Sequence, residues 1–365
     1  MNIVAEYWDR FQSYLFPRLE IALEEPLTQN LKQFVRVLDI IRIEQFIASP
    51  HFQWMGRKAK DRRSLARAFI AKALYDFPTT ELLIEALQLQ PALRRLCGFE
   101  DRKSVPSAST FSRAFAEFAE VNLGDKVHEA LVKTYVGEKV VLHNSRDSTE
   151  VVAREKPAKK EKAAPKPKKK RGRPKKGEKP APPEPKRLEK QQKQTAEEAL
   201  AELPRVCNVG SKKDSKGNLH SWIGWKAHID WADGSIPLTV VTTSASLHDS
   251  QAAIPMARLT ARRCTSLYDL MDAAYDAEPI RAVSEELGHV PIIDRNPRAG
   301  EVVPMEPYRA KRYNERSTAE RGNSRLKDEF GFRHLRVRGH SKAHTHLMFG
   351  ILVLFADQLH KVFSG

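Results

Sequence analysis

The sequence predicts an α/β protein in which helices cover a mixed sheet, an all-helical segment comes first, and a basic insertion interrupts the sheet. Three observations lead to this prediction. Residues 1–135 repeat apolar side chains at helical spacing, strand and helix patterns alternate from residue 139 onwards, and Lys and Pro dominate residues 156–194. We therefore expect two folded domains, 1–135 and 136–365, with residues 156–194 disordered inside the second.

The first domain is expected to be helical throughout. Helical spacing is clear in "LARAFIAKAL" (65–74) and in "VPSASTFSRAFAEFAE" (105–120), where Ser and Thr precede an amphipathic run, as is typical of a helix start. If that run is the second helix of a helix-turn-helix, Ser109, Ser112 and Arg113 would face DNA. An ordinary helical hairpin is the alternative.

The second domain opens with a strand pattern and continues as strands alternating with helices. The dipeptide Asp233-Gly234 indicates a hairpin turn between two of the strands. We expect strands at 139–152, 220–232, 236–245, 266–276 and 289–294. Helices are expected at 250–263, 279–288 and from about 313 to the end.

The basic character of the chain is concentrated in one segment. Residues 156–194 contain 17 Lys and Arg against 4 Asp and Glu, or +13, which leaves +3 of the total +16 for everything else. Eight prolines and almost no large apolar side chains leave too little surface to bury to offset chain entropy. A tethered polycation of this kind is typical of an arm that binds nucleic acid.

Composition also bears on where the protein acts. Cys97, Cys207 and Cys264 are widely spaced and lack ligand spacing, which favours reduced thiols in the cytoplasm. The longest apolar run, "LMFGILVLFA" (347–356), is shorter than the roughly 18 residues that cross a membrane. It predicts a buried helix. We expect a cytoplasmic protein with no membrane partner, and no signal peptide is recognised at residues 1–20.

Two acidic residues follow apolar strands. Asp147 comes after "VVLHN", and Asp272 ends "LYDLM". Acids at strand ends project from the edge of a sheet, where carboxylate oxygens can hold a divalent cation and leave positions for water and phosphate. A third carboxylate would complete such a site.

The best third candidate is Glu320, in "YNERSTAERGNSRLK". Tyr313, Arg316, Glu320 and Lys327 would lie at about 0°, −60°, −20° and −40° around one helix. All four therefore share one narrow stripe. A solvated polar face is the alternative interpretation.

The spacing Tyr-x2-Arg-x3-Glu-x6-Lys resembles the signature of bacterial insertion-sequence transposases with a DDE catalytic triad. "RDSTEV" resembles their first-aspartate motif and "LMDAAYDAEPI" their second, with Asp147 and Asp272 as the ligands. "PIIDRNPR" and "TTSASLHDSQ" fit the family's connecting segments, and residues 88–115 resemble its helical domain. The resemblance covers most of the chain outside the basic insertion.

The resemblance implies a ribonuclease-H-like catalytic domain, with Asp147 on its first strand, Asp272 after its fourth and Glu320 on a late helix. It implies two Mg²⁺ or Mn²⁺ ions held by these acids, one activating a water and one stabilising the leaving 3′ oxygen. The freed 3′-OH would then attack target DNA. Arg316 and Lys327 would contact phosphates, and Tyr313 would lie near the transferred end.

The implied partner is double-stranded DNA, as the terminal inverted repeats of an insertion sequence and as the target. A homodimer on paired ends, associated with the bacterial nucleoid, is expected. Two alternatives stay open: a domesticated DNA-binding protein without catalysis, and a ribonuclease-H-like nuclease without strand transfer. The insertion soon after Asp147 leaves the partner of the first strand open, and the short interval 298–312 makes a hairpin-forming pathway doubtful.

The basic insertion contains a short motif. Arg171, Gly172, Arg173 and Pro174 resemble the core of AT-hook peptides, in which two Arg lie along the minor groove. A·T-rich minor grooves are narrow and strongly negative, which attracts inserted Arg. A solvated linker is the alternative.

Other polar and aromatic residues receive structural interpretations. We expect Asp249 to cap a helix, with support of the metal ligands or contact with DNA by His248 and Asp249 as the alternative, and we expect Trp222 and Trp225 to lie in the core. His340 and His344 are one helical turn apart, yet without a nearby acid or Cys a zinc site is not expected. Three further acids compete with Asp272 and are set aside on the motif match: Asp269, Asp276 and Asp294.

Overall fold

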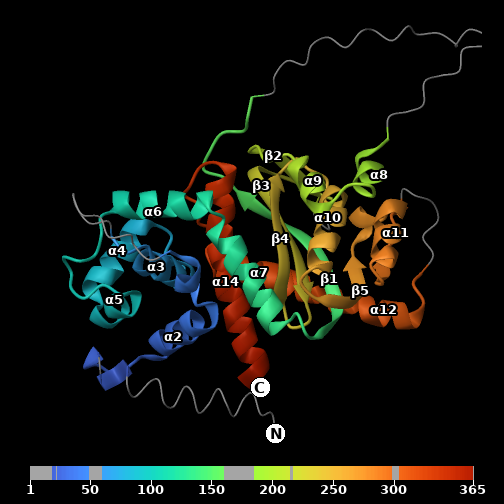
Figure 1. Ribbon diagram of the computed structural model, residues 1–365. Coiled ribbons are helices and arrows are strands. Elements are labelled where there is room, and N and C mark those ends of the chain that lie inside the picture. Colours follow the sequence, from blue (N-terminus) through green and yellow to red (C-terminus); the bar gives the residue numbers. More distant parts are fainter. Residues whose placement is uncertain are drawn as a thin grey trace, which may run out of the picture.

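The structure is a computed structural model that describes residues 19–21, 23–48, 60–159, 185–213, 217–297 and 304–364. Its first part is a cluster of helices, drawn in blue to green in Figure 1. Thr28, Asp61 and Thr79 each cap a helix by accepting a backbone N–H, which satisfies donors left free in the first turn. The elements are α2 Gln29–Ile41, η1 Ile43–Phe46, α3 Arg62–Leu74, α4 Thr80–Leu89, α5 Pro91–Cys97, α6 Ala108–Glu120 and α7 Leu123–Tyr135.

The connection between α5 and α6 spans residues 98–107. A DNA-binding helix-turn-helix joins its helices through a turn of about three or four residues. The longer connection favours the helical-hairpin interpretation of this segment over the helix-turn-helix.

A six-stranded mixed sheet forms the second part. The strand patterns in the sequence are found close to where they were expected, and the predicted mixed sheet covered by helices is confirmed. The strands are β1 Val140–Val152, β2 Asn208–Lys213, β3 Leu219–Ala232, β4 Ile236–Ser244, β5 Thr265–Met271 and β6 Val290–Ile293.

Strand β1 lies in the middle of the sheet. It pairs antiparallel with β3 and parallel with β5, and β5 pairs parallel with β6. The antiparallel partner of the first strand is therefore β3, which follows the basic insertion. On the other edge of β3, both β2 and β4 pair antiparallel. Strand β2 was not predicted.

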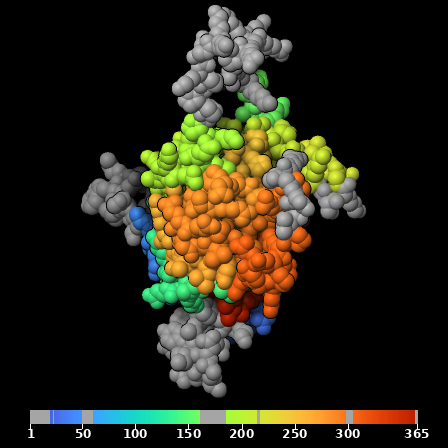
Figure 2. Space-filling model, turned by 90° about the vertical axis from the view of Figure 1, so that its right-hand side faces the viewer, coloured from blue at the N-terminus to red at the C-terminus, as the bar shows by residue number. Residues whose placement is uncertain are grey.

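Helices cover the sheet on both sides. In Figure 1, α10 and α11 lie to the right of the strands, and α7 and α14 lie to the left. Figure 2 turns the right-hand side toward the viewer, where the orange surface of α11 and α12 lies below the yellow-green surface of α8 and α9. The helical elements are α8 Arg187–Gln191, α9 Ala196–Ala201, α10 Ser250–Ala261, η2 Ala273–Tyr275, α11 Glu278–Glu286, α12 Pro307–Tyr313, η4 Asn314–Arg316, α13 Ser317–Asp328 and α14 His340–Ser364.

Helix α14 belongs to both parts of the molecule. It contains the apolar run 347–356 and is buried between the N-terminal helices and β4. Phe349 lies 5.5 Å from Phe69 of α3 and 6.1 Å from Phe115 of α6, measured between ring centroids. One continuous core therefore joins the N-terminal helices to the sheet. None of the described helices is long and apolar enough to cross a membrane.

The prediction that all of residues 156–194 are disordered is wrong at its C-terminal end. Residues 185–194 include α8, and Arg258 of α10 donates to the backbone carbonyls of Gln191 and Gln192 at 2.9 and 2.7 Å. Leu188 packs against the apolar cluster under α10 and α11. The half-buried Arg258 guanidinium, the buried Gln191, whose Nε2 donates to the Gln251 carbonyl at 2.9 Å, and the apolar contact of Leu188 hold a stretch whose composition alone predicted disorder. The AT-hook-like residues 171–174 lie outside the described residues.

Candidate active site

Asp147 and Asp272 lie at the same level of two neighbouring strands. In the parallel pairing of β1 with β5, Ser145 stands opposite Leu270. Two residues further along, Asp147 and Asp272 therefore lie side by side. Asp272 follows the last residue of β5, but Asp147 is still within β1, where it pairs with Ile229 of β3, so the expectation that Asp147 lies at the end of its strand is wrong. Asp272 also caps η2, because its Oδ1 accepts the backbone N–H of Ala274 at 2.9 Å.

The electrostatics of the two aspartates agree with this placement. Burial, and then the negative charge of Asp272, raise the pKa of Asp147 to about 6. Burial also raises the pKa of Asp272, and Asp249 adds to it. Two carboxylates in one partly dry site repel each other, so the site favours a neutralising cation or proton.

Glu320 does not join the two aspartates in this structure. Its side chain is 60% exposed, and its Oε1 accepts from Arg316 Nη2 at 2.7 Å. The guanidinium of Arg316 is itself close enough to Asp147 and Asp272 for its positive charge to oppose the rise in the pKa of both. Arg316 thus lies between Glu320 and the aspartates. Among the described residues, no three His, Cys, Asp or Glu side chains are arranged to hold a metal ion.

The stripe that contains Glu320 is broken into three helical pieces. Tyr313 ends α12, Arg316 ends the 3₁₀ turn η4, and Glu320 lies in the first turn of α13. The prediction of one regular helix from Tyr313 to Lys327 is therefore wrong. The neighbours still touch: the Arg316 guanidinium carbon lies 5.7 Å from the centre of the Tyr313 ring. Lys327 Nζ lies 3.5 Å from Glu150 Oε1 on β1.

Asn323 is a site residue that the sequence did not reveal. It lies on α13, one turn after Glu320, and its Nδ2 donates to Asp147 Oδ2 at 2.9 Å. The spacing of three residues places Asn323 on the same face as Glu320, so helical geometry alone could have identified it.

Asp249 also lies at the site, where its predicted capping role is wrong and the alternative of a residue beside the metal ligands is favoured. It occupies the N-cap position of α10, but its side chain makes no capping bond. Its Oδ1 instead accepts from Lys226 Nζ at 2.9 Å, and its carboxylate bonds to Ser148, the neighbour of Asp147. An ammonium group offers a buried carboxylate a stronger bond than a backbone N–H does.

A buried ion pair lies under the first aspartate. Arg146 donates through Nε and Nη2 to the two oxygens of Asp230 on β3, at 2.7 and 2.8 Å, and both side chains are buried. Thr260 Oγ1 of α10 donates to the same carboxylate at 2.6 Å. This network ties β1, β3 and α10 together one residue before Asp147.

The other acids considered for the triad have structural partners. Asp269 is buried and accepts from Asn144 Nδ2 at 2.9 Å, and Asp276 pairs with Arg281 at 2.7 Å. Asp294 Oδ1 accepts the backbone N–H of Arg295. Trp222 and Trp225 are buried, as predicted.

The C-terminal histidines also have protein partners. His344 bonds to Asp125 through Nε2 and to Thr242 through Nδ1, at 2.9 and 2.8 Å. His340 Nε2 lies 2.8 Å from the carbonyl oxygen of Thr242. These histidines join α14 to α7 and β4.

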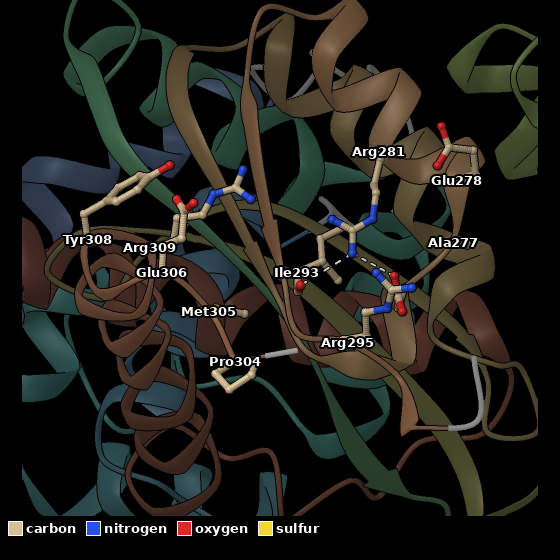
Figure 3. Close-up of a pocket in the computed structure, with 11 residues that line it drawn as sticks. Ala277, Glu278, Arg281, Ile293, Arg295, Pro304, Met305, Glu306, Tyr308 and Arg309 are labelled. Atoms are coloured by element: carbon tan, nitrogen blue, oxygen red, sulfur yellow. Dashed lines mark hydrogen bonds and ion pairs between the residues drawn. The ribbon is translucent and has the colours of Figure 1, made fainter. Parts of the chain in front are cut away.

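A pocket of about 730 Å³ opens beside the Asp272 loop. In Figure 3, Tyr308 and Arg309 of α12 and Glu306, which precedes that helix, form one side, and Glu278, Arg281 and Arg295 form the other. Asn296, next to Arg295, donates its backbone N–H to Asp276 Oδ2 at 2.9 Å. The pocket wall is therefore connected to the segment that carries Asp272.

The N-terminal DNA-binding candidates lie at the surface. Ser109, Ser112 and Arg113 are exposed on α6. Arg113 Nε donates to the Ser109 carbonyl at 3.4 Å, and Ser109 Oγ lies 3.0 Å from Ser107 Oγ.

Two protein families match the chain. Residues 21–117 match a family described as "Transposase domain (DUF772)", and residues 201–356 match one described as "Transposase DDE domain". Asp272 and Glu320 fall within the second match, and Asp147 lies between the two matched segments. No curated protein and no solved structure matched the chain.

Proposed function

Since this chain is a DDE transposase of the insertion-sequence type by both of its family matches, we propose that it cleaves the ends of its own element and joins them to target DNA. The observation that carries the proposal is the pair of carboxylates of Asp147 and Asp272, which lie side by side, one within β1 and one just past the end of the neighbouring strand β5, in a chain with a DDE domain.

The carboxylates fit a divalent cation. Asp147 and Asp272 offer hard oxygen ligands, and their mutual repulsion is the electrostatic condition that a cation relieves. Asp147, Asp272 and Glu320 would hold Mg²⁺ or Mn²⁺, with two ions expected for this family. The bound cations would supply Lewis acidity at the scissile phosphate.

Arg316 controls where Glu320 lies. Its guanidinium bonds to Glu320 and faces the two aspartates. A DNA phosphate offers Arg316 a bidentate partner that competes with the Glu320 carboxylate. DNA binding would thus release Glu320 to turn toward Asp147 and Asp272.

The remaining signature residues would position the DNA strand. Lys327 pairs with Glu150 on β1, in the strand that carries Asp147, so its ammonium group lies near the expected cleavage point. Tyr313 stacks beside Arg316 and would pack on the transferred end. Arg295 and Arg309 line the neighbouring pocket, where they would contact phosphates of the same strand.

Terminal inverted repeats and target DNA are the proposed partners, bound by a homodimer that pairs the two ends. Ser109, Ser112 and Arg113 on α6 are proposed to contact the duplex. The Arg171 to Pro174 segment is proposed to contact an A·T-rich minor groove.

The test is cleavage of the element's own ends. A duplex carrying the inverted repeat that flanks the reading frame is incubated with the protein and Mg²⁺, and nicked and joined products are separated on a gel. Asp147→Asn, Asp272→Asn and Glu320→Gln should each reduce cleavage by at least about a thousandfold, because phosphoryl transfer depends on the charges that these acids position.

Glu315→Gln is the matched control, since Glu315 is an exposed acid in the turn just before α13. It should cut as the parent does. Full activity in any of the three acid variants would remove that residue from the catalytic set. Cleavage without joined products would instead indicate a nuclease.

A further inference from the structure

A basic groove lies between the N-terminal helices and the segment that precedes α14. Its volume is about 640 Å³. The first turns of α4 and α6 line it, together with Arg154 beyond the end of β1 and residues 334–338. Its cationic lining is Lys72, Arg154, Arg336, Arg338 and Lys342.

The charge of this groove is largely uncompensated. Glu81 is the one acidic residue in its lining. Among the described residues, no hydrogen bond or ion pair engages the side-chain nitrogens of Arg154, Arg336, Arg338 or Lys342. Four cations without a protein partner around one concave surface favour an anionic ligand with several charges.

The floor of the groove adds to this preference. Burial, with a smaller effect of Arg336, lowers the pKa of Lys72 to about 8, while Asp76 and Glu81 act in the opposite direction, and a bound phosphate would favour the charged form of Lys72. Helices α4 and α6 direct the positive ends of their dipoles into the groove, because residues 79–81 and Ala108 line it. Ser112 on α6 supplies a hydroxyl donor.

The groove is also fixed relative to the catalytic strand. Glu155, the neighbour of Arg154, accepts the backbone N–H of Gly339 at 3.1 Å, which ties Arg154 to the segment carrying Arg338. Arg154 lies seven residues after Asp147 along the chain. The two residues are therefore at most about 25 Å apart.

We propose that this groove binds the phosphate backbone of the element's end, within about seven base pairs of the phosphate held at Asp147, since duplex DNA rises about 3.4 Å per base pair. The ligand is duplex DNA recognised by its backbone, with no base read in the groove. This inference rests on the proposed function, because it assumes that the chain binds the ends of its element.

The groove variant is Arg336→Gln with Arg338→Gln. Both residues are exposed or partly exposed at the groove rim, so the fold should tolerate the change. The control is Lys126→Gln with Lys133→Gln, which removes the same charge from the exposed face of α7. Affinity for a 40-base-pair duplex carrying the element's end, and for a scrambled duplex, is measured between 50 and 200 mM KCl.

Removing two phosphate contacts should reduce the slope of log affinity against log salt by about 1.8 on both duplexes. Raising the salt from 50 to 200 mM would then weaken DNA binding by the variant by a factor about ten times smaller than for the parent. The control should keep the parent's slope. Ser112→Glu, which places a carboxylate in the groove, should weaken binding to both duplexes.

Phosphate ethylation interference gives an independent readout. The parent should show interference within about seven base pairs of the cleaved phosphate, and the groove variant should lose it. If the parent binds and nicks the end while the groove variants keep its slope and interference pattern, the groove inference is wrong and the proposed function stands. If the parent binds neither duplex, both are wrong.

Discussion

Asn323 Nδ2 donates a 2.9 Å hydrogen bond to Asp147 Oδ2, although 176 residues separate the two side chains in the sequence. The bond leaves the other carboxylate oxygen of Asp147 available and fixes the orientation of the group. Groups that orient metal ligands typically change metal affinity by 10- to 100-fold when removed.

We therefore expect Asn323→Ala to raise the Mg²⁺ concentration needed for half-maximal cleavage by about 10- to 100-fold. Ser324→Ala, on the exposed side of the same helix, should leave this concentration unchanged. An unaltered Mg²⁺ requirement in Asn323→Ala would show that the bond does not prepare Asp147 for a cation.

Gly322 sets the distance between α13 and the sheet. A Cβ at this position would lie 2.5 Å from Cζ3 of Trp231, which is fully buried on β3. Gly322→Ala should therefore lower the free energy of unfolding by about 1–3 kcal/mol, despite the better helix propensity of Ala. It should also reduce cleavage, because α13 carries both Glu320 and Asn323.

Trp231→Phe provides the check, since the smaller ring makes room for the added methyl group. Denaturant unfolding of the two single variants and the double variant gives the coupling between the sites. Independent, additive losses would mean that the close approach of Gly322 to Trp231 does not position α13.

Mg²⁺ should stabilise the folded protein through the aspartate pair. The raised pKa of Asp147 means that its ionised form, which it adopts at pH 7.5, is less favourable in the folded protein than in the unfolded chain. At ten times its dissociation constant, Mg²⁺ should add about 1.4 kcal/mol, or roughly 2 °C in Tm.

Asp147→Asn should melt above the metal-free parent at pH 7.5 and should lose the response to Mg²⁺. The Glu315→Gln control should keep it. Thermal unfolding with and without Mg²⁺ measures both effects. Equal Mg²⁺ stabilisation of the parent and Asp147→Asn would place the cation elsewhere.

Buried histidines should make the fold sensitive to acid. Burial lowers the pKa of His128 to about 3 and those of His228, His340 and His346 to about 4. Below about pH 6.5 the unfolded chain binds protons at these positions and the folded chain does not. Their stabilising contribution is therefore present above pH 6.5 and is lost as pH falls toward 4, at up to about 1.4 kcal/mol per pH unit for each.

Asp39, Asp147, Asp272 and His344 act in the opposite direction, because the fold raises the pKa of each. The four histidines outweigh these groups because their folded-state pKa values of about 3 to 4 lie below the whole interval, so the urea midpoint should be lower at pH 5 than at pH 7.5. In His128→Gln the amide can still donate to the Pro237 carbonyl, and the decrease in urea midpoint between pH 7.5 and pH 5 should be smaller than in the parent. A midpoint that stays constant or rises at pH 5 would contradict this assignment.

The strands and the two aspartates could be predicted from sequence because their signals are local. An apolar run followed by an acid identifies the strand in both cases, and Asp272 does lie just past the end of β5, but Asp147 lies inside β1, which continues through polar residues to Val152. Strand β3 was recognised as a strand, but its pairing with β1 depends on contacts across the insertion. Helix α8 is held by contacts with α10 that are distant in sequence, including Arg258, which lies 67 residues beyond Gln191.

The third acid was harder to place for a physical reason. Helical spacing puts Tyr313, Arg316 and Glu320 on one stripe, but spacing cannot show that α12 ends at Tyr313 or that Arg316 binds Glu320. An exposed carboxylate such as that of Glu320 turns to bond with the nearest cationic side chain. Asp249 was assigned a cap from its position before α10, and Lys226, 23 residues earlier, binds it instead.

Helix α14 has a consequence for how such a chain can change over evolution. Its side chains complete the packing of α3 and α6 as well as that of β4, so its sequence must fit two different sets of packing partners at once. The N-terminal helices therefore cannot be exchanged between such proteins as an independent unit. A recombinant that took them from another transposase without a compatible α14 would leave Phe69 and Phe115 facing a mismatched surface. Under the proposed role of the N-terminal helices in binding DNA, new DNA-end preferences would be acquired more readily by changing exposed residues of these helices than by replacing the helices whole.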